Sequence, residues 1–138
     1  MAYEYEWKVR AGDTDYSGLL YTPRLVDCAI QGIEDLRAEV GFTNEFFQEA
    51  PYVPPVANVD INYRDTMLVD DTLQVSCTPT VGERSVTYRF DGLVEDDPVF
   101  DGTVTTVFIK KETETPRVVP ESFERGLQEY RTDSTTEQ

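Results

Sequence analysis

The chain has 138 residues, a length that suits one domain, and we expect that domain to span residues 1–130, with a polar tail over 131–138. Its 27 acidic and 12 basic residues give a net charge of −15, which excludes a general affinity for nucleic acid or anionic membranes. The chain contains no His, and this excludes Ser-His-Asp and Cys-His catalysis and most catalytic zinc sites.

The first predicted element is a half-buried strand over residues 3–9. Its aromatic and apolar residues alternate with charged ones, and period two with aromatic residues is typical of such a strand. The segment that follows, Gly12–Gly18, is acidic and contains Asp13 and Asp15. It places a carboxylate just before the start of the next element.

That next element is a predicted helix of about 18 residues, with apolar residues at helical spacing. Thr22 and Pro23 are typical of an N-cap followed by proline at the first helical position, and Gly41 is suited to end the helix in a left-handed conformation. Gly32 inside the helix costs about 1 kcal/mol relative to Ala. A close approach of another backbone would explain this glycine.

The second half of the chain is predicted to be mostly strands. Residues 42–55 are predicted to be irregular, with a short helical turn around Glu45. Four segments rich in β-branched and aromatic residues predict strands over 56–63, 72–80, 85–95 and 99–110. Turn candidates at 69–71, 81–83 and 95–98 predict three successive hairpins, hence a meander. A final amphipathic helix is expected over 120–130. One face of the antiparallel sheet must be buried, and the long helix can cover it.

Composition also predicts the compartment. No apolar run approaches about 20 residues and no basic-then-apolar leader opens the chain, so we expect a soluble, cytoplasmic protein without membrane contact. Cys28 and Cys77 have no metal-ligand spacing and are predicted to be buried, reduced thiols. The acid-rich surface, with only three Lys, leads to the hypothesis of a halophilic origin; an ordinary acidic domain is the alternative.

The acidic segment resembles the Asp-x-Asp-x-x-Gly motif of the hot-dog-fold acyl-CoA thioesterases, in the 4-hydroxybenzoyl-CoA thioesterase and YbgC-like branch. The matching residues are Asp13, Asp15, Gly18, Leu19, Leu20 and Tyr21. The likeness extends from about residue 5 to residue 119. The chain has Thr22 where YbgC-like members often carry His, and Leu25 where Tyr is common. The resemblance implies an α+β hot-dog fold: a curved antiparallel sheet of about five strands wrapped around one long central helix.

The resemblance also implies a site at the helix start. Unpaired N–H groups there carry partial positive charge, and a neighbouring carboxylate can attack a carbonyl or activate water. By this resemblance Asp15 is the catalytic carboxylate, either as nucleophile or as general base, and the backbone N–H of Thr22 holds the thioester oxygen. Gly18 and Tyr21 are candidates for the substrate site; Gly18 could instead serve a tight turn, and Tyr21 could instead lie at a dimer interface or pack in the core. Asp13 is expected to brace the loop. The alternative is that Asp15 only caps the loop or the helix.

A CoA thioester carries about four negative charges, so local positive charge must face its phosphates despite the net field. The candidates on or beside the predicted strands are Arg64, Arg84, Arg89, Lys110 and Lys111. Taken alone, each is better explained as a solvated surface cation, and Lys110 and Lys111, the only adjacent basic pair, rank above the others. No metal or separate cofactor is expected, because CoA is part of the substrate.

The prediction is therefore an acyl-CoA thioesterase that assembles as a homodimer or homotetramer, with active sites between protomers. A non-catalytic hot-dog module that binds an acyl thioester or a protein partner is the alternative. A third possibility is an acidic α+β interaction domain with no link to thioesters.

Overall fold

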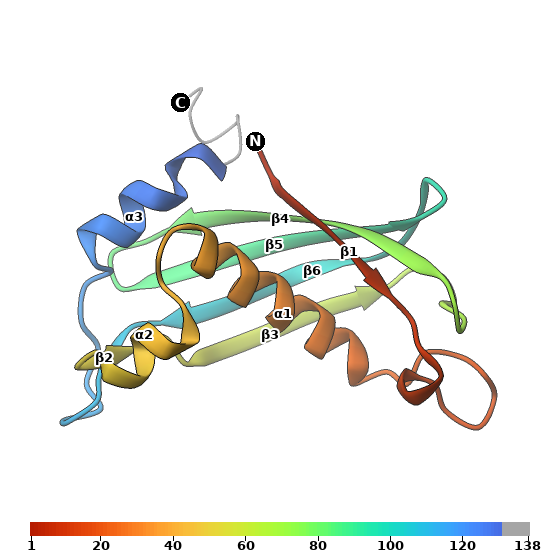
Figure 1. Cartoon of the computed structure of the whole chain (residues 1–138), viewed down its shortest axis with the longest axis horizontal. Coiled ribbons are helices and arrows are strands. Elements are labelled where there is room, and N and C mark those ends of the chain that lie inside the picture. The colour runs from red at the N-terminus through yellow and green to blue at the C-terminus, as the bar shows by residue number, and fades with distance from the viewer. Residues whose placement is uncertain (131–138) are drawn as a thin grey trace.

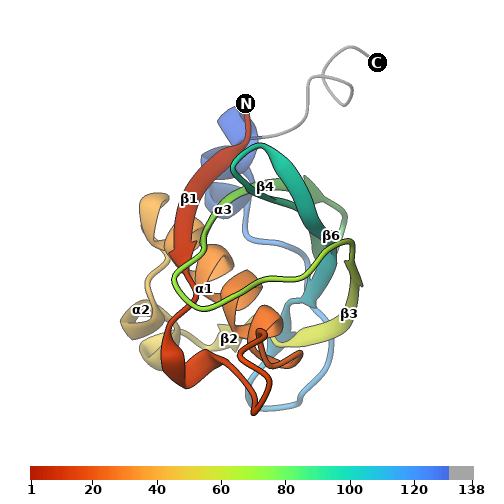
Figure 2. The same ribbon diagram turned by 90° about the vertical axis from the view of Figure 1, so that its right-hand side faces the viewer.

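A five-stranded antiparallel sheet curves around a helix in the computed structural model, which describes residues 1–130 (Figure 1). Seen end-on, the sheet runs from β1 round to β3, with α1 inside the curve (Figure 2). The predicted α+β class is confirmed. The tail predicted at 131–138 lies outside the described residues.

The predicted strands are present with small changes of boundary. The main sheet contains β1 (Tyr3–Lys8), β3 (Val56–Tyr63), β4 (Thr72–Val81), β5 (Ser85–Val94) and β6 (Asp97–Val107). The last predicted strand is divided, because β7 (Ile109–Lys110) leaves β6 and pairs with β2 (Tyr52–Val53) in a separate two-stranded sheet.

Three α-helices and two short 3₁₀ turns complete the described residues. The helices are α1 (Arg24–Glu39), α2 (Asn44–Glu49) and α3 (Glu121–Leu127), and the turns are η1 (Ala11–Asp13) and η2 (Gln128–Tyr130). At 16 residues α1 is the longest helix of residues 1–130. None of these helices combines the length and apolar character that crossing a bilayer requires.

The order of the strands differs from the predicted meander. The sheet runs β1-β4-β5-β6-β3, so β3 pairs with β6 and not with β4. Only two of the three predicted hairpins form, β4–β5 and β5–β6. The reason is that β1 occupies the edge of β4 that β3 would have needed. Asp70, predicted to lie in a hairpin turn, instead donates its N–H to the carbonyl oxygen of Val9 at 2.7 Å.

The start of α1 also differs from the prediction. Pro23 is the N-cap, and no side chain caps the helix, so the prediction of Thr22 as the N-cap is wrong by one residue. The carbonyl of Thr22 accepts hydrogen bonds from the hydroxyl of Tyr63 and the N–H of Leu25. The end of the helix is as predicted, because Gly41 adopts a left-handed conformation with φ of +91°.

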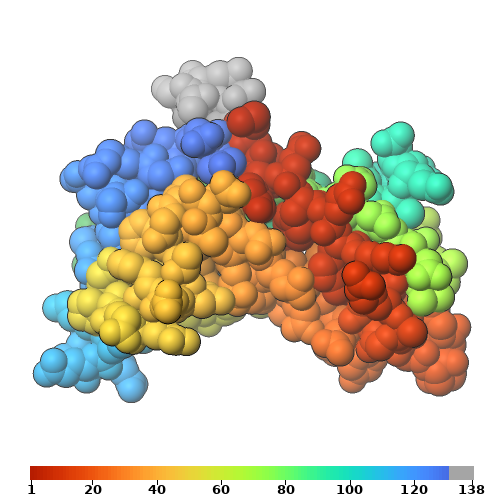
Figure 3. Space-filling view, in the orientation of Figure 1, coloured from red at the N-terminus to blue at the C-terminus, as the bar shows by residue number. Residues whose placement is uncertain are grey.

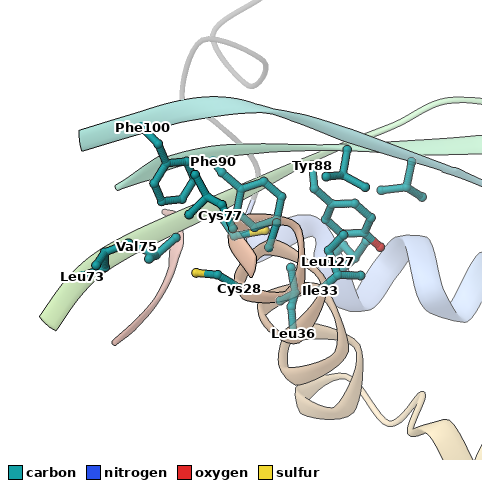
Figure 4. Close-up of a cluster of buried hydrophobic side chains, with 14 of the residues drawn as sticks. Cys28, Ile33, Leu36, Leu73, Val75, Cys77, Tyr88, Phe90, Phe100 and Leu127 are labelled. Carbon is teal, nitrogen blue, oxygen red and sulfur yellow. The ribbon is translucent and has the colours of Figure 1, made fainter. Parts of the chain in front are cut away.

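The core lies between the apolar face of α1 and the concave face of the sheet. Figure 4 shows Cys28, Ile33 and Leu36 of α1 with side chains from the strands and α3, namely Leu73, Val75, Cys77, Tyr88, Phe90, Phe100 and Leu127. Both cysteines are free and buried, as predicted. Burial raises the pKa of the Cys28 thiol to about 12 and also raises that of Cys77, so neither is a reactive thiolate at neutral pH.

Gly32 is explained by a side chain and not by another backbone. The ring of Tyr5, from β1, occupies the space that a Cβ on Gly32 would need. The expected close approach is therefore present, but its partner is an aromatic ring.

Candidate active site

Asp15 lies in the loop that joins η1 to α1. Two isolated bridges, Thr14 with Leu20 and Leu19 with Leu68, close this loop against the rest of the molecule. The backbone N–H and the hydroxyl of Ser17 both donate to Oδ1 of Asp15, at 2.7 and 2.5 Å. These hydrogen bonds, the hydroxyl first, lower the pKa of Asp15. The carboxylate is therefore ionised at neutral pH.

Asp13 braces the same loop, as predicted. Its Oδ2 accepts the N–H of Arg10 at 2.9 Å, and its Oδ1 lies 3.5 Å from Nε of Arg24. Its carbonyl oxygen accepts the N–H of Tyr21 at 2.7 Å. Asp13 thus ties the loop to the first residues of the helix.

The peptide groups at the helix start are held from several directions. The carbonyl of Tyr21 accepts the N–H of Arg24 at 2.8 Å. The carbonyl of Thr22 accepts the hydroxyl of Tyr63 at 2.8 Å and the N–H of Leu25 at 3.2 Å. The N–H of Thr22 donates to no acceptor within residues 1–130. It is thus the type of donor that can hold a carbonyl oxygen during acyl transfer.

Thr22 and Tyr63 line a surface hollow of about 380 Å³. The other lining residues come from the Asp15 loop and from the segment after β3, and they are Leu19, Leu20, Arg64, Asp65, Thr66 and Met67. Arg64 is held by Asp101 through two hydrogen bonds, of 2.7 and 3.1 Å. The hollow combines apolar lining with polar groups, which suits a small organic ligand.

Two further predicted residues lie at this end of the molecule. Gly18 has φ of +83°, so the loop turns there in a conformation that favours glycine. The side chain of Tyr21 is 54% exposed, so it does not pack in the core of the chain. It remains a candidate for contact with substrate or with another protomer.

The cations predicted to bind phosphate are not all together. Arg89 lies on β5 and pairs with Asp91 at 3.4 Å. The ammonium of Lys111 donates to the carbonyl oxygens of Phe47 and Gln48, at 2.6 and 3.0 Å, where α2 ends. Lys111 therefore fastens β7 to α2.

Arg84 and Lys110 do meet, in a hollow of about 360 Å³ that they share with Arg117. The guanidinium of Arg117 lies 4.4 Å from the ring centroid of Tyr52. Sequence reasoning did not select Arg117, because it is a single cation in a segment without regular structure. We call Arg84, Lys110 and Arg117 the basic cluster.

The basic cluster and the Asp15 loop lie at opposite ends of the molecule. In Figures 1 and 3 the loop is at one end, and the segments of α2, β2 and β7 are at the other. Within one chain, the basic cluster is therefore remote from Asp15. No group of three or more Cys, Asp or Glu side chains within residues 1–130 is arranged to hold a metal ion.

Comparison with known proteins identifies the family and the fold. A family model of the thioesterase-like superfamily matches residues 9–127. Many solved structures share the fold. Slr0204 from Synechocystis, a 1,4-dihydroxy-2-naphthoyl-CoA thioesterase, superposes with a TM-score of 0.87 at 14% identity, over 93% of this chain and 96% of that one.

The gentisyl-coenzyme A thioesterase BH1999 superposes with a TM-score of 0.82 at 15% identity, over 91% of this chain and 99% of that one. SAV2348 from Staphylococcus aureus, solved in complex with CoA, gives a TM-score of 0.87 at 13% identity, over 94% and 84% of the two chains. No curated protein matches the chain by sequence. The family match covers most of the chain and agrees with the predicted reaction class, thioester hydrolysis. The chain belongs to the thioesterase-like superfamily.

Proposed function

We propose that the protein hydrolyses an acyl-CoA thioester to a free acid and CoA, and that Asp15 and the N–H of Thr22 perform the chemistry. One observation carries this assignment. An ionised carboxylate lies in the loop that leads into a helix start whose Thr22 N–H is free, beside a partly apolar hollow. Membership of the thioesterase-like superfamily supports it.

The reaction can follow either of two balanced routes. Asp15 attacks the thioester carbon, the C–S bond breaks, and the resulting mixed anhydride is hydrolysed by water. Alternatively, Asp15 removes a proton from water and the water oxygen adds to the carbonyl carbon; the C–S bond then breaks, and the CoA thiolate leaves and takes up the proton as the free acid is released. In both routes, the Thr22 N–H stabilises the negative charge that develops on the thioester carbonyl oxygen. One such donor increases the rate by a factor on the order of 10²–10³. Thiolate is a good leaving group, so the absence of His is no obstacle.

A second copy of the chain would complete the site. Within residues 1–130, β3 is an edge strand that pairs only with β6. Val59 and Tyr63 lie opposite the buried residues Val104 and Phe100, so they are on the concave face, yet they are 39% and 45% exposed. An edge with an open hydrogen-bond ladder and uncovered apolar side chains favours pairing with a second sheet. We infer a homodimer in which β3 pairs with β3 of the partner; a tetramer would be built from such dimers.

This pairing would bring the two remote ends together. Two identical edge strands related by a two-fold axis perpendicular to the sheet pair antiparallel, so the Tyr63 end of one β3 lies beside the Val56 end of the other. The Tyr63 end carries the Asp15 loop, and the Val56 end lies near β2 and β7. The basic cluster of one protomer would then serve the site of its partner, and its charges would hold the phosphates of CoA.

The first experiment measures thiol release from a panel of aromatic, short-chain and long-chain acyl-CoAs. We expect Asp15→Ala to abolish turnover while the circular dichroism spectrum and the melting temperature stay unchanged. Asp96→Asn, in the β5–β6 turn and outside the Asp15 loop and the lining of its hollow, is the matched control and should retain full activity. Binding of acyl-CoA by the wild type without turnover would support the non-catalytic module instead.

Subunit mixing tests the shared site. Asp15→Ala protein and Lys110→Ala/Arg117→Ala protein are each impaired, and their subunits are exchanged under mild denaturant. If each site uses both protomers, one site of every heterodimer is intact, and activity at low substrate recovers to about a quarter of the wild-type value in a statistical mixture. If the mixture shows only the average of its two parents, the basic cluster does not act across the interface.

The charge balance leads us to infer a working environment of high salt. At about 1 M salt the Debye length is about 3 Å, so the repulsion among 27 acidic residues is screened. An acidic surface with few Lys is suited to such a medium.

A further inference from the structure

The hydroxyl of Tyr63 is the one side-chain group of residues 1–130 that bonds to the backbone of Thr22. It donates to the carbonyl oxygen of Thr22 at 2.8 Å, across 41 positions of sequence. Tyr63 is the last residue of β3, and its backbone is fixed by pairing with Phe100 of β6. The hydroxyl of Tyr63 therefore connects the end of β3 to the backbone just before α1.

The contact acts on the peptide group next to the free donor. The N–H of Thr22 belongs to the Tyr21–Thr22 peptide, and the carbonyl of Thr22 belongs to the Thr22–Pro23 peptide, so both groups share one Cα. On the other side, the carbonyl of Tyr21 accepts the N–H of Arg24 at 2.8 Å. With both neighbouring carbonyls held, the direction of the Thr22 N–H is fixed before a ligand arrives.

We propose that Tyr63 is a positioning residue for hydrolysis, which aims the Thr22 N–H at the developing oxyanion. This inference rests on the proposed function. A preorganised donor stabilises a transition state because it needs no reorganisation when charge develops. A loose donor loses part of that benefit even though it remains present.

The environment of Tyr63 argues against a mainly structural role for its hydroxyl. In the single chain the residue Tyr63 is 45% exposed and Thr22 is also exposed, so this hydrogen bond is not part of the buried core and its loss should cost little in the stability of the fold. Tyr63→Phe removes one oxygen atom and keeps the ring against the hollow. Its effect should therefore appear in the rate and not in the fold.

The kinetic test compares Tyr63→Phe with Tyr130→Phe, which removes a hydroxyl from η2, outside the Asp15 loop and its hollow. We expect Tyr63→Phe to lower kcat about tenfold and to change KM less than twofold, because the lost interaction is made in the transition state. The melting temperature, the dimer mass by light scattering and the acidic limb of the pH profile should stay unchanged. Tyr130→Phe should behave as wild type. An unchanged kcat in Tyr63→Phe, or a loss matched by lower stability, overturns the proposal.

A binding test separates this inference from the reaction itself. Two non-hydrolysable CoA analogues are compared. One is a difluoroketone, in which CF₂ replaces sulfur and the carbonyl readily adds a nucleophile to give a tetrahedral adduct like the transition state. The other is a thioether, in which CH₂ replaces the carbonyl. We expect Tyr63→Phe to weaken binding of the difluoroketone several-fold and to leave that of the thioether unchanged. If the difluoroketone alone binds more weakly to Tyr63→Phe but the wild type shows no turnover, the proposed hydrolysis is rejected and the positioning role of Tyr63 is retained. Turnover by the wild type with equal effects on both analogues would reject only the positioning role.

Discussion

The ring of Tyr5 lies directly over Gly32, in the space that a side chain at that position would occupy. The hydroxyl of Tyr5 also donates to the carbonyl oxygen of Cys28 at 2.8 Å, one turn before Gly32. A residue of β1 is thereby fastened to the middle of α1, and the glycine makes this close approach possible.

Gly32→Ala should therefore destabilise the protein. Ala is the better helix former by about 1 kcal/mol, but its Cβ would overlap the Tyr5 ring, and overpacking costs about 1–3 kcal/mol. We expect a net loss in the free energy of unfolding, measured by urea denaturation. In a Tyr5→Ala background the same substitution should be neutral or stabilising. An equal loss in both backgrounds would show that the ring is not the cause.

The pH profile should depend on Ser17. Its two hydrogen bonds stabilise the ionised form of Asp15 and lower its pKa, so activity is full above that pKa and is lost as the pH falls through it. Ser17→Ala removes the stronger contribution, so the acidic limb of kcat/KM should move to higher pH. The wild type should show no inflection near pH of about 6.5, where His titrates, because the chain has none.

Tyr16→Phe is the matched control for Ser17→Ala, because its fully exposed side chain lies in the same loop. Its acidic limb should coincide with that of the wild type. An acidic limb that stays in place in Ser17→Ala would mean that a group other than Asp15 governs it.

Two buried hydroxyls should be dispensable for stability. Tyr88 and Thr106 are 0% and 1% exposed, and the two hydroxyls are neighbours, but neither makes a hydrogen bond of good geometry within residues 1–130. A buried polar group without a partner carries its desolvation cost uncompensated. We expect Tyr88→Phe to leave the free energy of unfolding unchanged or to raise it by about 1 kcal/mol. A loss above about 1 kcal/mol would indicate that an internal water satisfies the hydroxyl.

Added salt should increase kcat/KM for acyl-CoA. The net charge of −15 repels an anionic substrate, and salt screens that repulsion. The measurement is a salt series with an inert salt over the range in which the circular dichroism spectrum is constant. A steady decrease across that range would contradict this electrostatic account.

The proposed dimer should depend on Val59. In antiparallel pairing of β3 with itself, an acidic side chain at this position would place like charges close together beside the apolar strip. We expect Val59→Asp to yield a monomer by light scattering and to lose activity. Asn58→Asp, the adjacent position, which faces the opposite side of the sheet, is the matched control and should remain dimeric. A Val59→Asp protein that stays dimeric would place the interface elsewhere.

The sequence by itself determined the main strands and the long helix to within a few residues, and the buried face of the first strand and of that helix. Alternation over residues 3–9 predicted β1, and the spacing of Leu25, Ile33 and Leu36 predicted α1 and its buried face. The Asp13–Gly18 motif located the Asp15 loop. These features depend on neighbours a few positions away, so periodicity and local turn chemistry are sufficient to predict them.

The tertiary structure alone decided which elements lie side by side. It paired β3 with β6, brought Arg117 to Arg84 and Lys110, and joined the hydroxyl of Tyr63 to the carbonyl of Thr22. Hydrophobic periodicity predicts that one face of an element is buried, but it does not predict which other element packs against that face. Contacts between distant segments depend on the packing of the whole chain, and so the partners of Thr22 and Arg84 could not be derived from local spacing.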